Sequence, residues 1–332
     1  MNYNKKHFRR LILLIFLMSA ALGSAAIGVG TGTVNISAGE VFRAVFSDDG
    51  STARLLIWNL RLPRVLCGGL AGACLAVSGC ILQCVMRNSM ASPSTIGVTS
   101  SAAFFGYLLL AVIPGYADFL PVVSIIGAFL TSSAIYLLAY SRGASAIRII
   151  LAGMAVSAFF GALSDWIKLH YADSLGNVSG FLVGGFNGCT WDSLLTVLPY
   201  AAAGIVVCVF LPGKMNILML GDENAASLGL PTGTFRFVLI AAASVLAGSA
   251  VALGGLVSFV GLIVPHTARL RIGSDSRYLK PASALLGFVL VTLCDTLGRV
   301  IMPPGEVPVS IILSLIGAPF FIWLLRSREK GV

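Results

Sequence analysis

Long runs of apolar residues alternate with short polar connections along the whole chain. The runs cover residues 11–27, 65–85, 95–113, 119–140, 149–167, 194–211, 237–253, 256–270, 281–300 and 309–325. An α-helix needs about 20 mostly apolar residues to cross the hydrocarbon core of a bilayer. The pattern therefore predicts an all-α polytopic membrane protein with about ten transmembrane helices.

The seventh and eighth runs need a separate argument, because residues 237–264 form one apolar stretch that is longer than a bilayer requires. Gly254 and Gly255 interrupt this stretch, and Arg269 and Arg271 follow its end. We therefore expect two helices that are joined by a tight turn at the glycine pair.

The first run follows a basic segment that contains Lys5, Lys6, Arg9 and Arg10, so it resembles a secretory signal. A signal peptide is normally the only apolar segment near a soluble domain, whereas many more apolar runs follow here. We therefore expect the first run to be retained as a helix.

Composition supports the membrane interpretation, since 57% of the residues are hydrophobic and only 11% are charged. Soluble domains carry roughly 25% charged residues. We expect one transmembrane domain over residues 1–332. It comprises a first span at 11–27, spans two to six within 61–211, a cytoplasmic loop at 212–235 and spans seven to ten within 236–326.

The net charge of +9 is attributed to cytoplasmic loops rather than to nucleic-acid binding, because Lys and Arg accumulate on the cytoplasmic side of membrane proteins. With the N-terminus inside, 16 of the 22 Lys and Arg residues lie inside and six lie outside. Ten spans also return the C-terminus to the cytoplasm. The sequence thus predicts a chain that is embedded in a lipid bilayer with both termini cytoplasmic.

No pattern of catalytic or metal-binding residues occurs in the sequence. There is no G-x-x-x-x-G-K-[ST] phosphate loop, no H-E-x-x-H and no C-x-x-C, and the three histidines are far apart. The seven cysteines lack metal-ligand spacing and are odd in number, so we interpret them as small, membrane-buried side chains. We expect no catalytic residue, no metal and no cofactor bound by this chain.

The cytoplasmic loop contains the signals of a short, capped helix. Gly221 or Asp222 can begin the helix, Gly229 can adopt the left-handed conformation at its end, and Pro231 prevents continuation. Two interpretations stay open: an ordinary loop helix, or a coupling helix that docks on a cytosolic ATPase. The candidate coupling residues are Gly221, Asp222, Glu223, Ala226, Ser227, Leu228 and Gly229.

Arginines at the outer side form the second candidate site. Arg61 and Arg64 flank Pro63, which is expected at the first helical position of the second span. A cation at this position opposes both the helix dipole and the positive-inside rule. These arginines either reach lipid phosphates or bind carboxylates of an extracytoplasmic partner. Arg299 is a third candidate, although Asp295, one turn earlier, can neutralise it.

A third group of residues is a candidate for the lining of a polar path. Asp165 and Lys168 lie three positions apart near the outer end of the fifth span, and they either neutralise each other or line the path. Residues 181–186, which include Phe181, Gly184, Gly185 and Phe186, are too short to span the bilayer, so we expect a partial, re-entrant or interfacial helix.

Three stretches resemble the FecCD-type permease family, the membrane subunits of ABC importers for iron-siderophore, haem and cobalamin. The first runs from Arg61 through Gly72 and Arg87 to Gly97, and the second covers residues 220–229. The third runs from Gly261 through His266, Asp295, Arg299 and Glu306 to Leu325.

The resemblance implies a type II importer architecture in a bacterial plasma membrane: a homodimer of ten-helix subunits, two cytosolic ATP-binding subunits that use ATP, and an extracytoplasmic substrate-binding protein. It implies that Arg61, Arg64 and Arg299 dock the binding protein and that residues 222–229 form the coupling helix. It also implies that the fifth and tenth spans line the path together with residues 181–186.

The alternative is an ion-coupled secondary transporter. That class is expected to carry acidic residues on broken helices at mid-depth, whereas Asp165 and Asp295 lie towards the outside of their predicted spans. The sequence therefore favours the importer subunit.

Overall fold

The computed structural model describes residues 2–32, 36–47, 50–140, 146–172, 179–303 and 305–329, and every regular element within these residues is helical. Ten of the helices coincide with the ten apolar runs. They are α1 (Asn2–Gly30), α4 (Leu62–Val85), α5 (Val98–Val112), α6 (Leu120–Tyr140), α7 (Ala146–His170), α10 (Trp191–Phe210), α13 (Thr232–Gly254), α14 (Val260–Ile272), α15 (Ser276–Ile301) and α16 (Val309–Glu329).

Shorter helical elements connect the long helices. They are α2 (Ala38–Phe46), α3 (Thr52–Leu56), the π-helical turn η1 (Ile57–Arg61), the 3-10 turn η2 (Pro114–Phe119), α9 (Ser179–Val183), α11 (Pro212–Leu218) and α12 (Asp222–Ser227). Seven helices of the described residues are long and apolar enough to cross a membrane, whereas α5, α14 and the apolar part of α16 are shorter.

The second span begins earlier than the sequence predicts. The helical segment is continuous over 34 residues, from Thr52 to Val85, and the Ser51 side chain caps its start by accepting a hydrogen bond from the Arg54 backbone N–H. Pro63 therefore lies inside a helical segment and not at its first position. Proline has no N–H and crowds the carbonyl four residues earlier, and the π-helical turn directly before it relieves both problems.

The connection between α13 and α14 is also longer than predicted. The helix α13 ends at Gly254, and α14 begins only at Val260, after Gly255 (φ +66°) and Phe259 (φ +67°) both take up left-handed φ values. A Cβ on Gly255 would overlap the backbone carbonyl of Phe181. The chain therefore remains non-helical here so that it can pass closely over α9, and α14 has only 13 residues.

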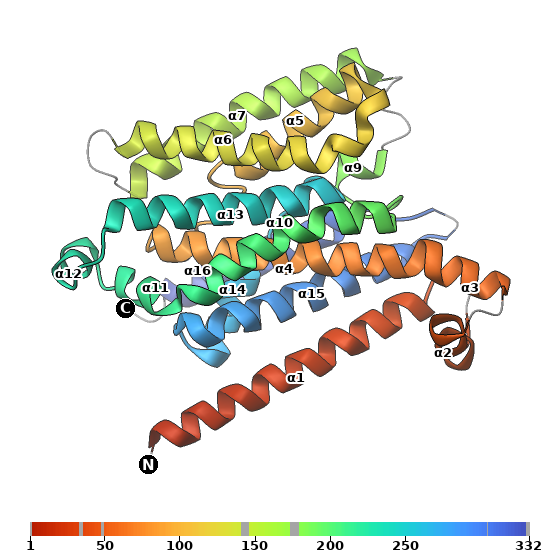
Figure 1. Cartoon of the computed structure of the whole chain (residues 1–332), viewed down its shortest axis with the longest axis horizontal. Helices are drawn as coiled ribbons and strands as arrows, with labels where there is room; N and C mark the ends of the chain where they lie inside the picture. Colours follow the sequence, from red (N-terminus) through yellow and green to blue (C-terminus); the bar gives the residue numbers. More distant parts are fainter. Residues whose placement is uncertain are drawn as a thin grey trace.

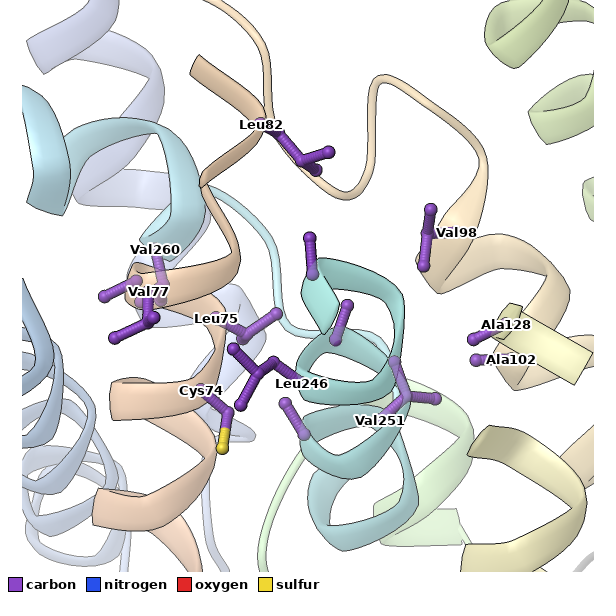
Figure 2. Close-up of a cluster of buried hydrophobic side chains, with 14 of the residues drawn as sticks. Cys74, Leu75, Val77, Leu82, Val98, Ala102, Ala128, Leu246, Val251 and Val260 are labelled. Carbon is purple, nitrogen blue, oxygen red and sulfur yellow. The ribbon is translucent and has the colours of Figure 1, made fainter. Parts of the chain in front are cut away.

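The core of the molecule is built around α4, which runs between α13 and α15 (Figure 1). Figure 2 shows Cys74 and Leu75 of α4 facing Leu246 of α13. Small residues of α4 permit such close packing, because a Cβ on Gly72 would overlap the Gly287 carbonyl of α15. All seven cysteines are free and buried, as predicted.

The two ends of the bundle differ. The N-terminus of α1 and the C-terminal end of the chain lie at the same end as α12, and α2, α3 and α9 lie at the other (Figure 1). We refer to these as the α12 end and the α9 end.

Candidate docking and coupling sites

Asp295 of α15 binds two arginines at the α9 end. Arg64 Nε donates to Asp295 Oδ2 at 3.0 Å, and Arg64 Nη2 donates to Oδ1 at 2.9 Å. Arg299 Nε lies 3.4 Å from Asp295 Oδ2. Glu306 adds a second carboxylate, since its Oε2 accepts from Arg64 Nη1 at 2.8 Å. The cluster therefore contains two arginines and two carboxylates, and the bidentate Arg64–Asp295 pair is its strongest contact.

Arg61 and Arg299 bind the last turn of α1. Arg61 Nη1 donates to the Val29 carbonyl at 3.0 Å, and Arg299 Nη2 donates to the Gly28 carbonyl at 2.8 Å. The last carbonyls of a helix have no partner within the helix and carry its negative partial charge. These arginines therefore fasten α1 to η1 and α15. The sequence shows both arginines but gives no sign of this role.

The three predicted docking arginines meet at a cavity of about 230 Å³ that Arg61, Arg64, Arg299 and Glu306 help to line. A second cavity of about 180 Å³ shares Arg64 and Glu306 with it and extends towards Gly185 and Phe186. Arg61 and Arg299 are only 6% and 4% exposed, so the arginines form the floor of a recess and do not project from the surface.

The capped helix in the predicted cytoplasmic loop is present as α12. Gly221 precedes it with φ +110°, and Gly229 follows it with φ +79°. Arg236 of α13 donates to Asp222 Oδ1 at 2.6 Å, which ties the start of α12 to a long helix. Leu220 and Leu228 are 59% and 61% exposed. The sequence predicts the helix but not its tether to Arg236.

Asp165 and Lys168 lie together on α7. Lys168 Nζ is 3.6 Å from Asp165 Oδ1 and 4.7 Å from the centre of the Tyr107 ring. The Asp165 side chain is 79% exposed. The two side chains therefore form an ion pair, and the Asp165 carboxylate lies on the exposed surface of this chain.

The predicted partial helix is α9, and it is only five residues long. The chain turns at Gly184 (φ +89°), whose carbonyl accepts from the Ser310 N–H of α16 at 3.1 Å. Phe186 is fully buried and packs near Gly68 and Gly254, whereas Phe181 is partly exposed beside Tyr107. Phe186 therefore belongs to the core of this subunit, and Phe181 is the residue of the two that can face a path.

Comparison with known proteins matches residues 9–327 to the model of the FecCD transport family. A probable siderophore transport system permease protein of Bacillus subtilis is 36% identical over 325 residues, 96% of each chain. The hemin transport system permease protein of Yersinia pestis is 36% identical, over 96% of this chain and 95% of that one.

Among solved structures, an inward-facing conformation of a putative metal-chelate type ABC transporter superposes with a TM-score of 0.83 and 29% identity, covering 95% of this chain and 98% of that chain. The family match spans nearly all of the described helices and confirms the resemblance of the sequence motifs. The chain is a member of the FecCD transport family.

Proposed function

We propose that the chain is the membrane-spanning permease subunit of a binding-protein-dependent ABC importer, and that it carries a metal chelate of the iron-siderophore, haem or cobalamin class into the cell. The observation that carries this proposal is the family match over residues 9–327. The relatives' names, which include siderophore, hemin and vitamin B12 permeases, support the class of substrate. ATP is hydrolysed on a separate subunit.

The assembly is a homodimer of this chain with two cytosolic ATP-binding subunits and one extracytoplasmic substrate-binding protein, in a bacterial plasma membrane. The α12 end faces the cytoplasm. Lys6, Arg9 and Arg10 lie at the start of α1 and Arg269 and Arg271 in the last turn of α14, and this accumulation of cations supports the orientation.

The recess at the α9 end receives acidic side chains of the binding protein. Arg64 is the contact residue, because its side chain is 13% exposed and its partner Glu306 is 31% exposed. An incoming carboxylate can replace Glu306 on Arg64 while Asp295 stays in place. Arg61 and Arg299 lie behind Arg64 and add positive potential to the recess.

This exchange predicts that Glu306→Gln strengthens docking, because the competing carboxylate is removed. A partly exposed ion pair is worth up to about 1 kcal/mol, which corresponds to roughly a fivefold change in affinity. Surface plasmon resonance with the cognate binding protein measures this affinity. Asp118→Asn, an exposed acid at the same end, is the control with the same change in net charge. Unchanged or weaker docking by Glu306→Gln would contradict the exchange.

At the other end, α12 contacts the ATPase, and residues Gly221 to Gly229 transmit its motion. The exposed Leu228 and the tether from Asp222 to Arg236 support this role. The path runs beside α7 and α9, where Asp165, Lys168, Phe181, Gly184 and Gly185 lie; Phe186 supports this wall from behind.

The test is chelate uptake by proteoliposomes that contain the chain, its ATPase and its binding protein. We expect uptake only with ATP, and loss of uptake when residues 221–229 are deleted although the chain still inserts. Uptake by the chain alone on an ion gradient would instead identify a secondary transporter and would overturn the proposal.

A further inference from the structure

A basic pocket of about 240 Å³ lies at the α12 end, away from the recess at the α9 end. It is lined by Lys6, Arg9, Arg10, Arg271, Ile272 and Gly273. Residues 6–10 of α1 form one wall, and the end of α14 with the following Gly273 forms the other. Four of the six lining residues are therefore cations.

One of these cations is held in place by protein contacts. Arg10 Nε donates to the Ile272 carbonyl at 3.0 Å, its Nη1 lies 3.8 Å from Asp275 Oδ2, and its guanidinium lies 4.9 Å from the centre of the Tyr278 ring. Arg10 therefore joins α1 to α14 and to the start of α15, and its charge is balanced by Asp275.

Asp275 is ionised at neutral pH, but its single negative charge does not also neutralise Lys6, Arg9 and Arg271. Burial acts to raise its pKa, but a hydrogen bond from Asn216, another from the backbone N–H of Arg277 and the charges of Arg277 and Arg10 hold the pKa below its usual value. Its two oxygens are thus already used by these groups.

The other three cations have no partner among the described residues. Lys6, Arg9 and Arg271 are exposed, and none of them makes a hydrogen bond or an ion pair within the part of the chain that the structure describes. Like charges that gather in one concave site repel one another, so the pocket is stabilised by an anion.

Apolar surface begins directly beside the pocket. Phe8, Ile12 and Ile15 of α1 are 67%, 50% and 66% exposed. On the opposite side of the helix, Leu13, Leu14 and Leu17 pack on a cluster formed by α4, α14 and α15. The pocket therefore lies where a polar rim meets a lipid-facing helix surface.

We propose that this pocket binds the phosphate of an anionic phospholipid in the leaflet that faces the cytoplasm, and that the lipid's acyl chains lie along the exposed face of α1. The leaflet rests on the orientation given under Proposed function. Arginine pairs with phosphate oxygens through two N–H groups and lysine adds a point charge, so basic pockets between membrane helices suit such headgroups. The bound lipid bridges α1 to α14.

Native mass spectrometry of the purified full-length chain, titrated with phosphatidylglycerol or phosphatidylcholine, tests the proposal. The variant K6Q/R9Q/R271Q removes the three unpartnered cations and leaves Arg10 in place. The control K214Q/R277Q/R326Q removes three cations from the same end but outside the pocket. Each cation near an anionic headgroup contributes roughly a fivefold change in affinity, so the pocket variant should bind phosphatidylglycerol about a hundredfold more weakly.

The control should bind phosphatidylglycerol as the unmodified chain does, and phosphatidylcholine should bind weakly to all three. Equal losses in both triple variants, or equal binding of the two lipids, would overturn the proposal. Displacement of the lipid by millimolar inorganic phosphate would assign the pocket to free phosphate instead. Weaker binding of the ATPase subunit with unchanged lipid binding would assign it to a protein contact. If the triple variant does not insert, the single variants Arg271→Gln and Arg277→Gln give the same comparison. The affinity of Arg271→Gln for phosphatidylglycerol should fall about fivefold, and that of Arg277→Gln should stay unchanged.

Discussion

At the scale of single residues, Asp295 determines the charge balance of the α9 end. It is 4% exposed, and it accepts both hydrogen bonds of the bidentate contact from Arg64 while it pairs with Arg299. Desolvated ions are stable only when their partners remain. The carboxylate of Asp295 therefore keeps the buried guanidinium of Arg299 and the partly buried guanidinium of Arg64 in place. Through Arg299 it also supports the end of α1.

The variant Asp295→Asn should destabilise the protein, because it leaves these two guanidinium groups without their buried counter-charge. Removal of one partner of a buried pair costs about 3 kcal/mol, which corresponds to a fall on the order of 5–10 °C in the thermal midpoint. Thermal unfolding in detergent, followed by size-exclusion chromatography, measures the change. Glu306→Gln removes the more exposed carboxylate and should shift the midpoint by at most about 2 °C. Equal shifts would contradict this assignment.

The residues of this cluster are visible in the sequence, and the spacing of Asp295 and Arg299 on one helix also predicts their ion pair. The two pairs that Arg64 makes are not predicted. Charged side chains near the ends of apolar runs are unusual and mark Arg61, Arg64 and Arg299 as candidates. Arg64, however, is 231 positions from Asp295 and 242 positions from Glu306. No local pattern relates residues at such separations, so only the packed bundle reveals the two ion pairs of Arg64.

At the scale of elements, α12 is a short helix that gains its rigidity from a neighbour. Six residues are too few to form a stable helix alone. The contact of Asp222 with Arg236 and the burial of Ala225 attach it to α13 and to the core. In the coupling role that we propose, a force on α12 would act on α13 through this contact.

Asp222→Asn should weaken the coupling between ATP hydrolysis and uptake, because it removes the charge that binds α12 to Arg236. We expect the number of chelates imported per ATP to fall, by up to roughly fivefold for an interaction of about 1 kcal/mol. Uptake and phosphate release in the same proteoliposomes give the ratio.

Glu223→Gln is the matched control, since Glu223 is an exposed acid on the same helix without an ion pair among the described residues. An equal loss in both variants would show that the net charge of α12 matters and that the tether does not.

Elements differ in how well their limits follow from the sequence. The glycines that flank α12 predict it almost to the residue, because capping depends on local backbone conformation. The second span begins at a local cap by Ser51, and it continues past Pro63 only because the π-helical turn η1 accommodates the proline. The start of α14 depends on a tertiary contact, since the Gly255–Phe259 connection passes over α9. Hydropathy therefore predicts that these helices exist but not where they begin.

At the scale of the whole molecule, small residues allow α4 to lie at the centre of the bundle. A Cβ on Gly79 would overlap the Gly261 carbonyl of α14, and one on Gly72 would overlap the Gly287 carbonyl of α15. Within lipid, the hydrophobic effect does not drive helices together. Van der Waals contacts between closely spaced backbones stabilise the bundle instead. The order of the helices around α4 therefore depends on these glycines.

Gly79→Ala should destabilise the bundle by about 1–3 kcal/mol, since a single methyl group forces two backbones apart. Gly161→Ala is the control, because nothing lies within 4 Å of a Cβ at that position of α7, and alanine favours helix formation there. Thermal midpoints of the two variants in detergent make the comparison. A lower midpoint for Gly161→Ala than for Gly79→Ala would refute this account of the packing.

The seclusion of every native thiol has a practical consequence. All seven cysteines are buried, so a membrane-impermeant maleimide has little to react with in intact cells. A single cysteine introduced at Ser227 or at Tyr116, both exposed and at opposite ends, then becomes the dominant labelling site without any prior removal of the native ones. We expect Tyr116→Cys to be labelled in intact cells and Ser227→Cys only after the cells are opened. This result would show that the α12 end faces the cytoplasm.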